Sequence, residues 1–460
     1  MSVIRAIPKP LIELPTDRPF VPTDEFAARI ETAIALLKKV GLDFFVVYGD
    51  RERAGDLHFL SGVDPRFEEG LLVLSSTGDR TIILGNENLG YAPDKALGIS
   101  VELYQEFSPQ GQLRDQSTQI SGLLKRLGLS TGSKVGVVGG KYLSSGFVTA
   151  PEKAFGVPSY LVDELRAIVG EGNISNAQKL FVSPDGGLRN TNTAHQIAEF
   201  EYAAAHSSMS VHAASAAITV GARADHVADH LFNVGLQLST HPMVNFGDKV
   251  ARALSSPTPQ VIAMGDAFQI AYGLKGTLTC RSGMVARNKT DLSSDAGDFF
   301  EAITLNYFDT VIAWYKALRL GAAAGDVYAA ADAVRDADLF KFALNPGHTL
   351  HYEEWLDTPF NPGSKTKLVS GMVLQADIIP DYQGPQIGLN IEDGLVLADA
   401  TLQKSLADLY PRVFERMQKR RNYVREVIGV ELDPSVLLLS NTPLWHAPYV
   451  LDMNLALTAS

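Results

Sequence analysis

The chain has 460 residues, 46% of them hydrophobic, and a formal net charge of −12. This length and apolar content predict two or three globular domains with sizeable cores. The negative charge gives no basic field that could attract phosphates, which argues against binding to nucleic acid or to an anionic membrane. Apolar runs stay far below the ~18 residues that span a bilayer. The single cysteine, Cys280, excludes an internal disulfide, so we expect a soluble, cytoplasmic protein.

Helix and strand patterns alternate in the first part of the chain. The spacing of apolar residues predicts an amphipathic helix over 23–41 and a second helix over 119–128. Apolar runs typical of buried strands lie at 42–49, 69–76, 80–85 and 133–140. Such alternation is typical of a small α/β domain. Turn residues are concentrated at 183–193, so the predicted domains are 1–185 and 186–460.

The second domain is predicted to be α+β, because long helical patterns open it and strands then alternate with helices. A β-hairpin is predicted over 265–283 and a closing helix over 410–429. The other helical patterns lie at 194–218, 225–239, 309–321 and 326–340. The segment 437–460 is too apolar for a disordered tail. We expect it to pack on this domain, with Trp445 and His446 near a cavity mouth or a dimer interface.

Four segments of the second domain carry a set of motifs. The most specific is Gly-Met-Val at 371–373, with Asp377 six residues after the glycine, followed by Ile-Glu-Asp-Gly at 391–394. Together the segments resemble the creatinase, aminopeptidase P and methionine aminopeptidase superfamily, whose domain is called the pita-bread fold. The other segments are "HPMVNFGDKVARALSSP" (241–257), "GDAFQIAYGLKGTLTCRSG" (265–283) and "NPGHTLHYEEW" (345–355).

The first domain carries part of the same resemblance. Its segment "DLHFLSGVDPRFEEGLLVLSS" (56–76) is similar to the non-catalytic N-terminal domain of creatinase and aminopeptidase P. The resemblance therefore implies a creatinase-like α/β domain followed by a pita-bread domain.

In the metallopeptidase members of this superfamily, five side chains hold two divalent ions. The resemblance places the metal-binding histidine at His348 and the last glutamate at Glu392. Asp377 stands in place of the first glutamate, Ala271 in place of the first aspartate, and Cys280 in place of the second. Two ions at close range need carboxylates that bridge and chelate them. A dinuclear site is therefore not expected here.

The remaining polar groups predict the chemistry. His348, Asp377 and Glu392 form the predicted catalytic acid/base set, because clustered carboxyls and an imidazole shift one another's pKa values. No cofactor is expected. The alternative is a single divalent ion on the same three side chains, since one nitrogen and two oxygens make an open three-ligand site. The superfamily's proton-shuttling histidine falls on Leu254, which argues against creatine hydrolysis by the creatinase mechanism.

The stretch after His348 offers further polar groups. If it forms a strand, alternation puts His351 and Glu353 on one face and His348 and Glu354 on the other. Trp355 stands where the resemblance places a second substrate-contacting histidine.

The first domain can also contribute to substrate binding. In creatinase-like dimers the partner's N-terminal domain reaches into the active site with an arginine, which implies such a role for Arg51 or Arg53. The predicted substrate-binding residues are His351, Glu353, Trp355, Cys280, Arg281 and Arg51.

These observations support three hypotheses of function. The first is a cytoplasmic, homodimeric, creatinase-like hydrolase that cleaves a C–N or amide bond of a small cationic or zwitterionic molecule without a metal ion. The second is an aminopeptidase or dipeptidase for Xaa-Pro peptides that uses a single ion. The third is a non-catalytic binding protein on a peptidase fold.

Overall fold

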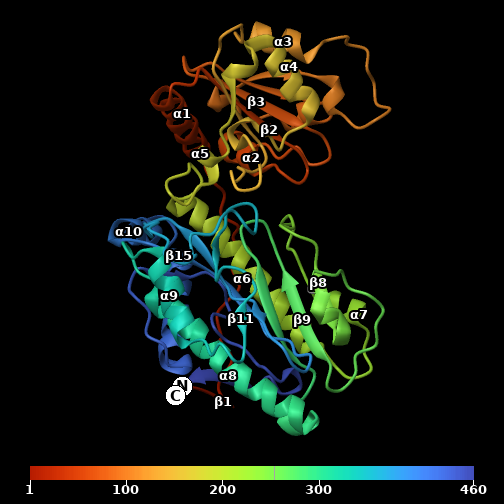
Figure 1. Cartoon of the computed structure of the whole chain (residues 1–460), viewed down its shortest axis with the longest axis vertical. Helices are drawn as coiled ribbons and strands as arrows, with labels where there is room; N and C mark the ends of the chain where they lie inside the picture. The colour runs from red at the N-terminus through yellow and green to blue at the C-terminus, as the bar shows by residue number, and fades with distance from the viewer. Residues whose placement is uncertain (253) are drawn as a thin grey trace. The chain divides into compact units, whose positions relative to one another are not determined.

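The computed structural model describes residues 1–252 and 254–460. The chain divides into two compact units (Figure 1). We call Val21–Arg189 the N-terminal unit, and Met1–Phe20 together with Asn190–Ser460 the C-terminal unit. Among the described residues, no helix is both long and apolar enough to cross a membrane.

The division between the units differs from the predicted boundary in one respect. It lies before Asn190, close to the predicted boundary after residue 185, but the first 20 residues belong to the C-terminal unit. The reason is strand β1 (Ser2–Ala6), which pairs antiparallel with β17 (Leu455–Ala459) at the other end of the chain. The sequence prediction assigned these residues to the first domain because it considered neighbours along the chain only.

The N-terminal unit is built on a six-stranded mixed sheet in the order β5-β4-β3-β2-β6-β7. Its strands are β2 (Phe44–Gly49), β3 (Gly70–Ser75), β4 (Arg80–Leu84), β5 (Ser100–Leu103), β6 (Val135–Val138) and β7 (Ile174–Asn176). Its helices are α1 (Thr23–Val40), α2 (Gly55–Ser61), α3 (Ile120–Arg126), α4 (Ser159–Val169) and α5 (Lys179–Val182).

Strand β2 shows why these runs are apolar throughout. Phe44, Val46 and Tyr48 pack in one core with α3 and α4, whereas Phe45 and Val47 face the other side and are equally buried. A sheet covered by helices on both faces needs hydrophobic residues at every position. The observed unit agrees with the predicted α/β domain.

The C-terminal unit contains a seven-stranded antiparallel sheet in the order β12-β13-β15-β10-β9-β8, with β16 also paired to β15. The strands are β8 (Met243–Phe246), β9 (Ala267–Tyr272), β10 (Thr279–Met284), β12 (His348–Thr349), β13 (Val373–Asp377), β15 (Ile391–Leu397) and β16 (Val436–Leu438). A small second ladder joins β11 (Lys341–Phe342) to β14 (Pro380–Asp381). Strands β9 and β10 form the hairpin predicted over 265–283.

Helices pack on this sheet (Figure 1). They are α6 (Ala194–Ala216), α7 (Ala224–Ala228), α8 (Ser294–Ala317), α9 (Ala324–Val334), α10 (Ala400–Leu409) and α11 (Pro411–Tyr423). Phe268, Ile270 and Tyr272 of β9 share a core with side chains of α6. Since side chains alternate along a strand, Gln269 and Ala271 face the opposite side. That opposite face carries the site described below.

Three helix predictions need correction. The helix predicted over 326–340 is α9, which ends at Val334. The pattern at 309–321 is the second half of α8, which begins at Ser294. The helix predicted over 225–239 ends at Ala228. Val234 and Gly235 have positive φ angles of 46° and 76°, which an α-helix does not allow.

The segment after β16 packs on the C-terminal unit, as the sequence predicts, and Trp445 and His446 are buried. Nε of Arg281 donates to the carbonyl oxygen of Trp445 at 2.9 Å. Arg281 lies on the face of β10 that is turned away from Cys280. Trp445 and His446 therefore lie behind the sheet and not at a cavity mouth.

Candidate active site

Four residues form a row across four neighbouring strands. Cys280 on β10 is directly opposite Ala271 on β9 and directly opposite Glu392 on β15. Glu392 in turn is opposite Asp377 on β13. Directly opposed residues in an antiparallel sheet project to the same face. His348, on the next strand β12, is opposite Gln375, two residues before Asp377.

A cavity of about 200 Å³ lies over this row. It contains the three predicted catalytic residues, together with Cys280 and Trp355 of the predicted substrate-binding set. Its volume is below the roughly 300–1,000 Å³ that is usual for drug-sized ligands. The lining residues are Thr240, Met243, Leu254, Gln269, Ala271, Leu278, Cys280, Leu344, His348, Glu354, Trp355, Asp377, Ile379, Asn390 and Glu392.

His348, Asp377 and Glu392 come close together inside the cavity. One ligand atom from each lies within 4.8 Å of the others, and Nε2 of His348 is 3.7 Å from Oε1 of Glu392. Nδ1 of His348 lies 3.2 Å from the carbonyl oxygen of Thr349. A carbonyl oxygen only accepts, so Nδ1 carries the proton and Nε2 is left as an acceptor in the neutral ring.

Burial controls the protonation of this cluster. It raises the pKa of Asp377 to about 7, with the charge of Glu392 adding to the effect. It raises the pKa of Glu392 to about 8, with Glu354 as the second cause, and it lowers the pKa of His348. Close to neutral pH the two carboxyls therefore share protons beside a neutral imidazole. Such pairs of shifted groups are typical of acid/base sites.

The donor set fits one metal ion and not two. His348, Asp377 and Glu392 supply one nitrogen and two oxygens at a spacing that suits a single ion. Ala271 offers no ligand atom. The Cys280 thiol is fully buried, and burial together with Glu392 raises its pKa, which opposes the thiolate that a metal needs. Neither residue at the two positions where the resemblance places aspartates therefore offers a carboxylate.

The loop after β12 supplies the cavity with an aromatic and an acidic side chain. The Trp355 indole stacks on the His348 imidazole, with ring centroids 4.1 Å apart and planes inclined by 22°. Trp355 stays 36% exposed. Glu354 also lines the cavity, and burial raises its pKa.

Two predicted substrate-binding residues of this loop lie outside the cavity. His351 is fully buried and packs edge-on against Phe200, and Glu353 is absent from the cavity lining. Strand β12 ends at Thr349, so the alternation assumed for this stretch does not continue beyond it. The carboxylate that the loop contributes to the cavity is Glu354 and not Glu353.

Of the two predicted arginines, Arg281 lies away from the cavity, whereas the role predicted for Arg51 depends on a partner subunit and stays a prediction. Nη2 of Arg281 contacts the carboxylate of Asp393 at 2.8 Å, and the same nitrogen donates to the carbonyl oxygen of Thr442. This guanidinium is buried behind the sheet and ties β10 to β15. Arg51, in the N-terminal unit, is largely exposed and pairs with Glu52 at 3.1 Å.

The structure adds polar residues that the motifs did not indicate. Asn390 lies two positions before Glu392, and its Nδ2 is 3.5 Å from Oδ1 of Asp377. Gln269 lies two positions before Ala271. Alternation along β9 from Ala271 would have identified Gln269 from sequence. Leu254, which stands where a proton-shuttling histidine was expected, does line the cavity.

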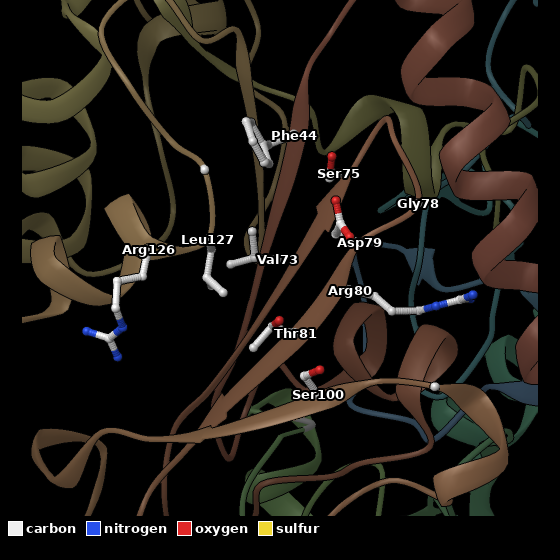
Figure 2. A pocket seen from close by; sticks show the side chains of 12 residues that line it. Phe44, Val73, Ser75, Gly78, Asp79, Arg80, Thr81, Ser100, Arg126 and Leu127 are labelled. Carbon is white, nitrogen blue, oxygen red and sulfur yellow. The ribbon is translucent and has the colours of Figure 1, made fainter.

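A larger hollow of about 580 Å³ lies in the N-terminal unit and is lined by Val73, Thr81 and Ser100 among others (Figure 2). Its two arginines extend to opposite sides in Figure 2. Arg80 donates to Glu31 at 3.1 Å, and Arg126 lies 3.4 Å from Glu102. The charged groups of this hollow thus have protein partners, whereas the smaller cavity holds clustered carboxyls.

No protein-family model and no curated protein matches the sequence. Solved structures do match the fold. The prolidase of Pyrococcus horikoshii OT3 has a TM-score of 0.62 at 16% identity, over 81% of this chain and 95% of that one. Dipeptidase PepE of Mycobacterium ulcerans has a TM-score of 0.62 at 18% identity, over 82% and 95%.

The X-Pro aminopeptidase of Thermotoga maritima MSB8 has a TM-score of 0.60 at 14% identity, over 80% of this chain and 95% of that one. These similarities cover both units of the chain. They show that it has the two-domain architecture with a pita-bread domain that the sequence motifs predict.

Proposed function

We propose that the protein is a hydrolase that cleaves a C–N or amide bond of a small cationic or zwitterionic molecule without a metal ion. The observation that carries the proposal is the direct opposition of Asp377 and Glu392 on β13 and β15 beside His348, in one small cavity. Two carboxyls that share protons near neutral pH can act as acid and base in one reaction.

The chemistry follows from these groups. The ionised carboxyl takes a proton from water as the water oxygen forms a bond to the substrate carbon. The protonated carboxyl gives its proton to the nitrogen as the C–N bond breaks, and the amine leaves. His348 presents Nε2 as an acceptor that can orient the water or the protonated carboxyl. The pair ends with its proton on the other carboxyl, and one proton exchange restores it.

The charge of the cavity supports a cationic substrate. Among its described lining residues three are acidic, Glu354, Asp377 and Glu392, and none is lysine or arginine. Carboxylates gathered in a buried space repel one another, and a bound cation relieves that repulsion. The small volume supports a small molecule.

A second candidate is an Xaa-Pro peptidase with a single ion. It is favoured by the three-residue donor set and by the activities in the names of the similar structures. His348, Asp377 and Glu392 would hold the ion, which when bound supplies Lewis-acid activation of a carbonyl and a more acidic water. Trp355 and Glu354 would still border the substrate.

The test compares metal-free and metal-supplemented protein. After EDTA treatment and desalting, the protein is incubated with small guanidino, amide and betaine compounds and with Xaa-Pro dipeptides, and products are followed by mass spectrometry. Turnover that survives EDTA supports the first candidate, and turnover restored only by Mn²⁺, Co²⁺ or Zn²⁺ supports the second. Ligand binding without any turnover would instead indicate a binding protein.

Variants connect the turnover to the site. Asp377→Asn and Glu392→Gln should each lower kcat by about 100-fold or more, the usual contribution of an acid or base. Glu353→Gln is the matched control, since Glu353 lies outside the cavity lining. Full activity in both active-site variants would remove these carboxyls from the chemistry.

A further inference from the structure

We propose, building on the proposed function, that Glu354, Gln269 and Trp355 form a subsite for an organic ammonium group of the substrate. The three side chains come from two elements, β9 and the loop after β12, and all line the same cavity. None of them belongs to the predicted acid/base set.

Glu354 supplies the negative charge. Its carboxylate lines the cavity, and no described lysine or arginine forms an ion pair with it. It also lies outside the cluster in which His348, Asp377 and Glu392 gather within 4.8 Å. Glu354 is therefore not part of that donor set, and a cationic group on the substrate would supply a direct counter-charge.

Gln269 supplies an acceptor that lacks a partner. It is 9% exposed, and its Oε1 has no hydrogen-bond partner among the described residues. Its Nε2 is 3.8 Å from Sγ of Cys280. Because Gln269 is two residues before Ala271 on β9, its side chain projects to the cavity face. A buried amide oxygen without a partner is unfavourable, and rotation of the amide toward the cavity would let a ligand N–H satisfy it.

Trp355 supplies an aromatic surface. One face of the indole is stacked on His348, while 36% of the residue remains accessible. An indole attracts organic cations through its ring quadrupole more strongly than the other aromatic side chains do. A carboxylate and an indole that are adjacent in the chain thus offer both parts of an ammonium site.

The test measures binding of two probes of equal shape and different charge. Choline and 3,3-dimethyl-1-butanol differ in that a carbon replaces the quaternary nitrogen. Both are titrated into the EDTA-treated full chain, and affinity is measured by calorimetry. Choline should bind at least ten-fold more tightly than the neutral alcohol. Equal affinities for the two probes would overturn the proposal.

Variants locate the bound charge. Glu354→Gln should remove the preference for choline, Trp355→Leu should weaken choline binding by roughly three- to thirty-fold, and Glu353→Gln should leave both affinities unchanged. Glu354→Asp, which keeps the charge, covers the case in which the glutamine variant does not fold, and it should retain part of the preference. Choline preference that persists in folded Glu354→Gln would contradict the proposal. A competition with Mg²⁺ in the Glu392→Gln variant, which lacks one of the three clustered metal donors, is a further test. Displacement of choline by millimolar Mg²⁺ there would also contradict the proposal, because it would indicate an inorganic cation at Glu354.

The titrations do not depend on turnover, so the two proposals can fail separately. Choline preference that depends on Glu354, in a protein without hydrolase activity, would contradict only the proposed function. Hydrolysis without any preference for the charged probe would contradict only the ammonium subsite.

Discussion

Cys280 and Glu392 face each other directly across strands β10 and β15. The side chain at position 280 therefore projects into the same cavity as the Glu392 carboxyl. It is a thiol and not a third carboxylate. On the other side of Cys280, the opposed residue is Ala271. One half of the row thus consists of the carboxyls of Asp377 and Glu392. The other half consists of Cys280 and Ala271, which carry no carboxylate.

Introducing carboxylates at both uncharged positions, Ala271 and Cys280, should create a site for divalent ions. We expect Ala271→Asp with Cys280→Asp to lower the melting temperature in EDTA, because two more buried carboxylates repel Asp377 and Glu392. Mn²⁺ should reverse the loss, since an ion at 100 times its Kd adds about 2.7 kcal/mol to the free energy of unfolding. Thermal melts with and without Mn²⁺ measure both effects.

Two controls make this result specific. Ala271→Asn with Cys280→Asn has similar size and no charge, and it should show a smaller loss in EDTA and no rescue by Mn²⁺. A double aspartate variant that melts identically with EDTA and with Mn²⁺ would show that the row cannot hold two ions even when the carboxylates are present.

Glu392 should make the protein less stable as the pH rises. Its pKa is raised by burial from about 4.5 to about 8, so the folded state holds a proton that the unfolded state loses between these values. The contribution of protonated Glu392 to the free energy of unfolding is fully present below about pH 4.5. It is lost as the pH rises to 8, by roughly 1.4 kcal/mol per pH unit. Glu392→Gln cannot ionise and avoids this loss.

Urea unfolding between pH 5 and 9, in EDTA, measures the effect. The stability of Glu392→Gln relative to the unmodified protein should increase with pH up to about 8 and then level off. A constant difference between Glu392→Gln and the unmodified protein across this range would mean that Glu392 titrates normally.

The pair of Arg281 and Asp393 should be important for stability and for the position of Glu392. Asp393 follows Glu392 on β15, and the Arg281 guanidinium also donates to the carbonyl oxygen of Glu392 at 3.1 Å. Both side chains are buried. Asp393→Asn leaves a buried guanidinium without its counter-charge, and such losses are about 3–5 kcal/mol.

Chemical denaturation of Asp393→Asn measures that loss, and Arg281→Met with Asp393→Leu is the comparison. The double variant removes both charges, so it should be more stable than Asp393→Asn alone. If Asp393→Asn unfolds at the same urea concentration as the unmodified protein, the ion pair contributes nothing to stability.

The sequence located His348, Asp377 and Glu392 better than the residues around them. These three side chains come together as the resemblance implied, because each lies on a strand or at its end, where pairing fixes its position. Arg281 was assigned to the same cavity as Cys280, although adjacent residues on a strand face opposite sides. Here the sequence itself held the information.

Other features could not be read from sequence. The loop after Thr349 has no periodicity, so nothing in the pattern shows that Glu354 and not Glu353 enters the cavity. The pairing of β1 with β17 joins the two ends of the chain, and no local pattern indicates such a contact. Both are consequences of tertiary packing.

His446 should reduce stability in acid. It is 1% exposed, and neither ring nitrogen has a hydrogen-bond partner among the described residues. Burial, with Arg281 as a second cause, lowers its pKa to about 3. In the unfolded state the imidazole has a pKa near 6.5 and binds a proton below this pH. In the folded state it stays unprotonated at the same pH. Stability is therefore complete above pH 6.5 and falls by roughly 1.4 kcal/mol for each pH unit below it.

His446→Leu tests this contribution, because leucine fills much of the same space without titrating. Between pH 7 and pH 5 the unmodified protein should lose about 2 kcal/mol more stability than the variant, as measured by urea unfolding. His230→Leu, at an exposed position, is the control and should follow the unmodified protein. If all three proteins lose stability in parallel over this range, His446 is protonated in the folded state, and the packing of the C-terminal segment behind β10 admits a charge.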